Sequence, residues 1–122
     1  MLNLLKMMAL IAVGFSLLLG CAARQVVVDP GNTSPAHESA LFQQARKYFI
    51  AQKYAEALPI LKYLSKRKNS DAQYALGYMY YYGVGVSRDE SVALNWMRFA
   101  AAKNNPRALL ALERYQALNP AH

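Results

Sequence analysis

Residues 72–86 of this chain read AQYALGYMYYYGVGV, and this stretch decides the fold. The face that carries Leu76 and Gly77 recurs at spacings of three and four residues, which predicts a helix over 71–82. The Gly-Val-Gly-Val segment at 83–86 ends that helix, because glycine tolerates the left-handed backbone that closes a helix. The stretch therefore predicts a helix that stops at a glycine-built turn.

The chain repeats itself around this stretch at a step of 36 residues. The recurring pairs are Ala57-Leu58 and Ala93-Leu94, Leu61 and Met97, Ala72 and Ala108, and Leu76 and Leu112. A period of this length is typical of an α-solenoid, in which each helical hairpin buries its apolar face only against its neighbours. Small residues at Ala57, Gly77 and Ala93 are expected to let the paired helices approach closely.

Four further helices complete the predicted domain, at 36–51, 54–67, 88–103 and 106–117. Their predicted starts are Ser34-Pro35, a capping box of Ser87 and Glu90, and Asn105-Pro106, while Asn69-Ser70 caps the helix at 71–82. No alternating strand pattern follows residue 30. The fold class is therefore all-α, a short α-solenoid of antiparallel helical hairpins with about five helices, over residues 35–120.

The residues of this repeat resemble a known family. Residues 72–80, Gly83 to Val86, Asp89, Ala93-Leu94, Trp96 and Ala100-Ala101 resemble one full Sel1-like repeat, a branch of the tetratricopeptide superfamily. Residues 42–67 resemble an ordinary tetratricopeptide repeat, with Ala45 where glycine is usual. The last helix has Glu113 where Gly77 stood, which indicates a polar cap. The resemblance implies a module that binds another protein.

The N-terminal segment has the pattern of a secretion signal. Lys6 precedes an uncharged run, and Leu18-Leu19-Gly20-Cys21 resembles the lipobox of bacterial lipoproteins. That resemblance implies lipidation of Cys21, a signal peptide at 1–20 and a lipidated tether at 21–34. An ordinary signal peptide or a transmembrane anchor is the alternative, although the run is short of the roughly 20 residues a span needs.

The same resemblance implies a location. Ala22, rather than an aspartate, follows the cysteine, which in lipoproteins of this kind favours the outer membrane with the body facing the periplasm. Within the tether, Val26-Val27-Val28 is either a short strand that pairs with a partner or an apolar patch, and Asp29-Pro30-Gly31-Asn32 reads as a turn. We therefore expect a lipid-anchored protein of the bacterial cell envelope.

The net charge indicates the kind of partner that the chain binds, and the cysteine content bears on how the fold is stabilised. The chain has 14 basic and 7 acidic residues, and residues 21–122, which exclude Lys6, keep a formal charge of +6. Such a balance favours anionic partners: lipid headgroups, acidic glycan or an acidic protein surface. Nucleic acid suits the charge as well but is not expected for an exported lipoprotein. With one cysteine there is no intrachain disulfide, so the fold depends on packing.

No catalytic constellation is visible in the sequence. His37 and His122 have no neighbouring ligands at metal spacing, and the Asp89-Glu90 pair suits a helix start. The Gly83-Val84-Gly85 segment lacks the strand and lysine of a phosphate loop. We therefore expect no enzyme activity, no metal and no cofactor.

Tyrosines and arginines mark the predicted binding surface. Tyr74, Tyr78, Tyr81 and Tyr82 share the face of helix 71–82 that lies off the repeat signature. By analogy with the superfamily, that face lines a concave groove, to which helix 36–51 contributes Phe42, Arg46 and Phe49 and the last helix Leu110 and Arg114. Tyrosine and arginine are enriched at binding hot spots. Packing in the core is the alternative, above all for Tyr78 and Tyr81.

A second candidate surface is a basic patch of Lys62, Lys66, Arg67 and Lys68 at the end of helix 54–67. Cations there are favoured by the helix dipole, so the patch is either a simple solvated face or a site for a partner or headgroup.

The resulting hypothesis is a membrane-anchored adaptor or assembly module that binds another envelope protein or a peptide segment. It would serve as an accessory subunit of a secretion, pilus or other envelope machine. The alternative is a cell-wall-associated factor that binds glycan or a murein enzyme.

Overall fold

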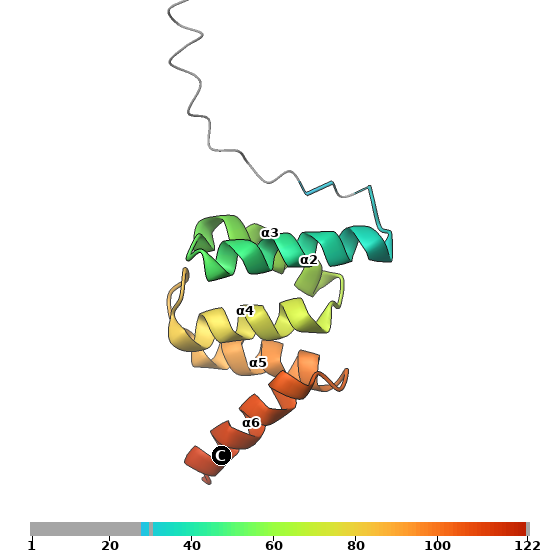
Figure 1. Cartoon of the computed structure of the whole chain (residues 1–122). Coiled ribbons are helices and arrows are strands. Elements are labelled where there is room, and N and C mark those ends of the chain that lie inside the picture. The colour runs from blue at the N-terminus through green and yellow to red at the C-terminus, as the bar shows by residue number, and fades with distance from the viewer. Residues whose placement is uncertain (1–27, 30, 122) are drawn as a thin grey trace, which may run out of the picture.

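The computed structural model describes Val28, Asp29 and residues 31–121, and the predicted signal peptide and Cys21 lie outside this part. The described part contains five helices and no strand, which confirms the all-α expectation (Figure 1). The helices are α2 (Pro35–Ile50), α3 (Tyr54–Lys66), α4 (Ser70–Tyr82), α5 (Glu90–Ala101) and α6 (Pro106–Leu118).

The helices stack as successive antiparallel hairpins, so that each one packs against the helices next to it in the chain (Figure 1). The α4–α5 pair has the most extensive contact, and α6 packs against α5 with no later helix beyond it in the described residues. This nearest-neighbour packing is the architecture of a solenoid, and the prediction of a short α-solenoid is confirmed.

Side-chain caps begin four of the five helices. Ser34, Asn69 and Asn105 each accept a hydrogen bond from a backbone N–H of the first turn, as predicted. The predicted capping box of Ser87 and Glu90 is wrong. Asp89 is the N-cap of α5, and its Oδ1 accepts from the Val92 N–H at 2.9 Å. The helix therefore begins at Glu90 rather than at residue 88, and the other helix ends lie within one residue of their predicted positions, except that α5 stops at Ala101 rather than 103.

Small residues make the close helix contacts on which the stack depends. Alanines with no exposed surface lie at the hairpin contacts: Ala45, Ala57, Ala72, Ala93, Ala100 and Ala108. Around them Ile60, Leu61, Leu64, Leu76 and Met79 are buried. The alternation of small and large side chains lets the helices interdigitate at the density of a protein interior.

Gly77 shows how tight these contacts are. An added Cβ at this position would lie 2.9 Å from Met97 Cγ and 3.0 Å from the Ala93 carbonyl oxygen. The predicted role of Gly77 as the small residue between α4 and α5 is therefore confirmed.

The turn after α4 depends on two glycines with left-handed backbone. Gly83 has φ of 67° and Gly85 has φ of 70°. A Cβ on Gly85 would collide with Tyr54 of α3, and Val86 packs against the core of the first hairpin. The turn therefore joins the two hairpins as well as ending α4.

The chain contacts the domain before α2 begins. Val28 is half-buried and packs against the core shared by α2, α3 and α4, and no strand includes it among the described residues. At least this residue of the predicted tether is held against the folded domain.

Candidate partner-binding groove

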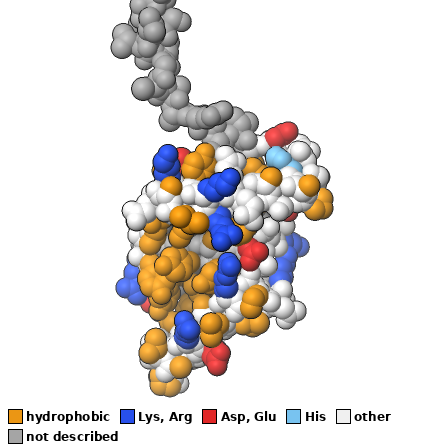
Figure 2. Space-filling view, in the orientation of Figure 1, with side chains coloured by type: hydrophobic (Ala, Val, Ile, Leu, Met, Phe, Trp, Pro, Cys, Tyr) orange, Lys and Arg blue, Asp and Glu red, His pale blue; other side chains and the backbone are white. Residues whose placement is uncertain are grey.

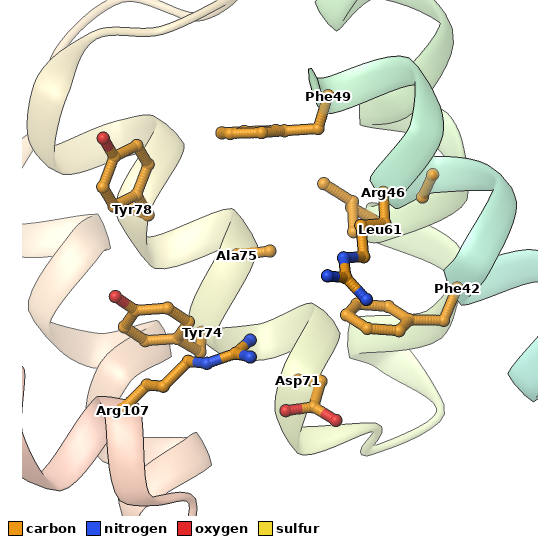
Figure 3. Close-up of a pocket in the computed structure, with 10 residues that line it drawn as sticks. Phe42, Arg46, Phe49, Leu61, Asp71, Tyr74, Ala75, Tyr78 and Arg107 are labelled. Atoms are coloured by element: carbon orange, nitrogen blue, oxygen red, sulfur yellow. The ribbon is translucent and has the colours of Figure 1, made fainter. Parts of the chain in front are cut away.

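One face of the solenoid carries an apolar hollow of about 320 Å³ between α2, α4 and the start of α6 (Figure 3). Phe42, Arg46 and Phe49 reach it from α2, and Tyr74 and Tyr78 reach it from α4. The other lining residues are Ala45, Leu61, Asp71, Ala75 and Arg107. Most of the lining residues are aromatic or aliphatic, and the charged ones are Arg46, Asp71 and Arg107.

A second hollow of about 300 Å³ continues this surface toward the C-terminal end of α6. Tyr74 and Tyr78 line both hollows, so the two form one surface, called here the groove. The second hollow is also lined by Tyr81, Tyr82, Leu94, Met97, Ala111, Arg114, Tyr115 and Leu118. Figure 2 shows hydrophobic side chains gathered on this face beside a row of basic ones.

The structure brings together all eight residues that the sequence nominated for a binding groove, since each lines one hollow or both. Leu110, which was expected to extend the groove, lines neither hollow, and Ala111 stands there instead. Asp71 and Arg107 were missed. Helical spacing could have predicted both residues. Asp71 is one turn before Tyr74 on α4, and Arg107 is two turns before Arg114 on α6, so each lies on the same side of its helix as a predicted groove residue.

The aromatic rings of the groove form a connected row. Phe49 meets Tyr78 with ring centroids 5.9 Å apart, Tyr78 meets Tyr82 at 4.5 Å, and Tyr82 meets Tyr81 at 5.0 Å. Edge-on and tilted aromatic pairs at such distances stabilise one another, so the rings hold one another in place. Tyr78 and Tyr81 are half-buried in this row, and Tyr82 is 60% exposed. The tyrosines thus belong to a packed surface that still presents ring area to solvent.

The last aromatic residue of the row is fixed by a hydrogen bond between helices. Tyr115 Oη of α6 donates to Glu90 Oε1 of α5 at 2.7 Å, and its ring lies 6.5 Å from that of Tyr81. The hydrogen bond to the Glu90 carboxylate raises the pKa of Tyr115 above its ordinary value. This hydrogen bond joins α6 to α5 at the second hollow.

Positive charge along the groove is largely unbalanced. Arg46, Arg107 and Arg114 are exposed, and none of them forms an ion pair with the described residues. The acidic residue lining the groove is Asp71, whose Oδ1 accepts a hydrogen bond from Asn105 Nδ2 at 2.9 Å. The groove therefore combines aromatic walls with guanidinium groups that are free to bind an anion.

The basic patch is smaller than the sequence indicated. Arg67 Nε donates to Glu38 Oε1 of α2 in an ion pair, and its guanidinium lies 5.7 Å from the Tyr63 ring centroid. The hydrogen bond to Glu38 raises the pKa of Arg67. Arg67 was predicted as part of the basic patch, but the structure pairs it with Glu38, so that it joins the end of α3 to the start of α2.

The remaining lysines of the patch, Lys62, Lys66 and Lys68, are exposed. Lys103 adds to them, because its Nζ donates to the Lys68 carbonyl oxygen. These lysines line neither hollow of the groove, so the basic patch is a separate surface.

Neither a metal-binding cluster nor a membrane-spanning helix is found among the described residues. Across the described ranges, no group of three or more His, Cys, Asp or Glu side chains could hold a metal ion. No described helix combines the length and apolar character required to cross a membrane. His122 lies outside these residues.

Comparison with known proteins identifies the hairpin at the centre of the groove. The family model described as Sel1 repeat matches residues 70–105. These residues form a Sel1 repeat. The match begins at the first residue of α4 and ends at Asn105, the cap of α6, so it confirms the resemblance stated from the glycines, Trp96 and the paired alanines.

One curated relative is similar to part of this chain. Over 55 residues the chain is 38% identical to the ERAD-associated E3 ubiquitin-protein ligase component HRD3A of Arabidopsis thaliana. The similarity covers 44% of this chain and 8% of that protein, so the chain spans a small part of its relative's length. No solved structure matches this chain significantly.

The Sel1 repeat supplies the middle of the groove, and its neighbours supply the two sides. Tyr74 and Tyr78 come from the first helix of the repeat. Arg46 comes from α2 before it, and Arg107 from α6 after it. The groove therefore needs both flanking helices, and a single Sel1 repeat would not form it.

Proposed function

We propose that this chain is a membrane-anchored interaction module whose groove binds a peptide segment of another protein. Sel1 repeats generally mediate binding between proteins. The observation that carries the proposal is the continuity of the two hollows through Tyr74 and Tyr78, which makes a groove with an aromatic floor and unpaired arginines. Such residues are the ones that dominate the energetics of protein interfaces.

The anchor follows from the N-terminal segment. The lipobox resemblance at Leu18 to Cys21 supports a lipidated cysteine, and Ala22 supports the outer membrane of a bacterial envelope. Several acyl chains on one residue would hold the protein stably at a membrane, because each buried methylene contributes about 0.8 kcal/mol. The anchor would then keep the domain close to that membrane, where it could bind its partner.

The proposed role of this interaction module is that of a subunit in a larger assembly. HRD3A is, by its name, a component of a ubiquitin ligase, and this chain is similar to 8% of its length. We extend to this chain only the general role of a subunit in an assembly. The assembly here would be an envelope machine for secretion, pili or outer-membrane proteins.

The test is a crosslinking pull-down from envelope extract with the acylated full chain. The double variant Tyr74→Ala, Tyr82→Ala should lose the partner while circular dichroism and the melting temperature stay nearly unchanged. Truncating an aromatic anchor typically costs 2 kcal/mol or more, which is roughly a thirtyfold loss of affinity.

Phe99→Ala is the matched control, because Phe99 is an exposed aromatic residue of α5 that lines neither hollow. Equal capture by the double variant and the control would place recognition outside the groove. Loss of capture after murein digestion would favour the cell-wall alternative.

A further inference from the structure

We propose that the partner segment is acidic: it places a carboxylate between Arg46 and Arg107 and an adjacent apolar side chain in the first hollow. This inference rests on the proposed function and adds the chemistry of its ligand. Figure 3 shows the geometry that carries it, with the Arg46 side chain reaching in from α2 beside Phe42 and the Arg107 side chain reaching in from α6 beside Tyr74.

The two arginines come from opposite ends of the solenoid and still line the same hollow. Arg46 stands on α2 and Arg107 on the first turn of α6, and both are exposed. A chain of hydrogen bonds sets the position of Arg107. Asn105 accepts from the Arg107 backbone N–H at 3.1 Å and donates to Asp71 of α4 at 2.9 Å. The start of α6 is thus fastened beside α4, where its second residue faces the hollow.

Asp71 does not neutralise this pair. Its Oδ1 accepts the hydrogen bond from Asn105, and no ion pair joins it to either arginine within the described part of the chain. One carboxylate against Arg46, Arg107 and Arg114 leaves the groove net positive. A positive concave surface raises the local concentration of anionic segments and favours their encounter.

The hollow itself selects an apolar neighbour for that carboxylate. Its volume of about 320 Å³ equals that of about ten water molecules at roughly 30 Å³ each. Phe42, Phe49, Tyr74 and Tyr78 offer those waters few hydrogen-bond partners, so an aromatic or long aliphatic side chain replaces them favourably.

A third hollow continues the surface on the polar side. It is lined by Glu38, Ser39 and Gln43 of α2, and it shares Phe42, Arg46, Asp71 and Arg107 with the first hollow. The arginines therefore stand at the border between an apolar and a polar compartment. A peptide that crosses this border presents an apolar side chain on one side and its carboxylate at the border, where guanidinium groups can bind it with two parallel hydrogen bonds.

The experiment uses the full chain, purified in detergent and immobilised, to select from random short peptides displayed on phage. We expect recovered peptides to be enriched in Asp or Glu next to Phe, Tyr, Trp or Leu. A labelled consensus peptide should then lose about tenfold or more in affinity with Arg46→Gln and with Arg107→Gln, because each removes a charged hydrogen bond. Arg98→Gln should bind normally, since exposed Arg98 of α5 lines a different hollow.

Charge reversal supplies the decisive arm. Arg46→Glu should abolish binding of the acidic peptide and restore binding of its Lys-substituted counterpart, with the melting temperature of the variant as the check of its fold. Peptides recovered without acidic enrichment, or an acidic peptide indifferent to both arginines, would overturn the inference and leave a peptide-binding groove standing. If no recovered peptide depended on Tyr74 and Tyr82 for its binding, both proposals would be overturned.

Discussion

Gly77 is the residue on which the α4–α5 contact depends most directly. We expect Gly77→Leu to destabilise the domain by about 2–4 kcal/mol, because a branched side chain must displace Met97 and the backbone at Ala93. The measurement is denaturant unfolding of the purified chain followed by circular dichroism.

Glu113 provides the matched control, because it occupies the position of Gly77 one repeat later, on α6. Glu113 is exposed, with no later helix packed on it in the described part, so Glu113→Leu should change stability by no more than about 0.5 kcal/mol. Equal losses at the two positions would show that the register of the helix pairs is wrong.

The two glycines of the turn differ in what surrounds them. Gly83→Ala should cost about 1–2 kcal/mol, since φ of 67° is unfavourable for alanine and its Cβ would lie 3.2 Å from Arg88 Cβ. Gly85→Ala should cost more, because it adds a collision with Tyr54 to φ of 70°. Melting temperatures of the two variants compare these costs, and the reverse order would mean that the turn does not press against α3.

At the scale of elements, the question at the start of α5 is which of two nearby residues, Asp89 or Ser87, caps the helix. Asp89→Ala should destabilise the domain by about 1 kcal/mol, because the Asp89 carboxylate caps the Val92 N–H. Ser87→Ala should have little effect, within about 0.5 kcal/mol. A larger loss from Ser87→Ala in denaturant titrations would restore the capping box.

The reason for this choice of cap lies in the contact between elements. The Asp89 N–H donates to the Tyr80 carbonyl oxygen of α4 at 2.9 Å, and Asp89 has extended backbone with φ of −146°. The turn is therefore tied to α4 just before α5 begins. Ser87 precedes this tie, so its side chain is not placed at the first turn of α5.

The whole molecule is expected to act as a domain on an anchor. Replacing Cys21 with Ser should release the protein from membranes or block its processing, because the thiol is the group that the lipobox resemblance marks for acylation. Cell fractionation checks the release, and intact mass checks the modification. An unmodified cysteine in a processed protein would refute lipidation, and an unchanged chain found uncleaved in the membrane with an unmodified Cys21 would indicate an ordinary anchor.

Local patterns predicted most of the helical architecture. Periodicity and caps placed the helices to within two residues, and the 36-residue step indicated which small positions face a neighbouring helix. The face of α4 that carries Tyr74 and Tyr78 was also predictable, because side chains three and four residues apart lie on one side of a helix. The sequence by itself therefore determined the all-α repeat and one wall of the groove.

Only the tertiary structure decided which residues from different helices lie together in the groove. Arg67 looked like part of a free basic patch, but packing of α3 on α2 placed it against Glu38. Arg46 and Arg107 lie far apart in the sequence, and they share a hollow because α6 is fastened to α4 through Asn105 and Asp71. Helix periodicity operates within one helix, whereas the angle and spacing between helices come from side-chain sizes at every contact along the stack. The opposite sides of the groove depend on those contacts, so its charge and shape belong to the folded molecule.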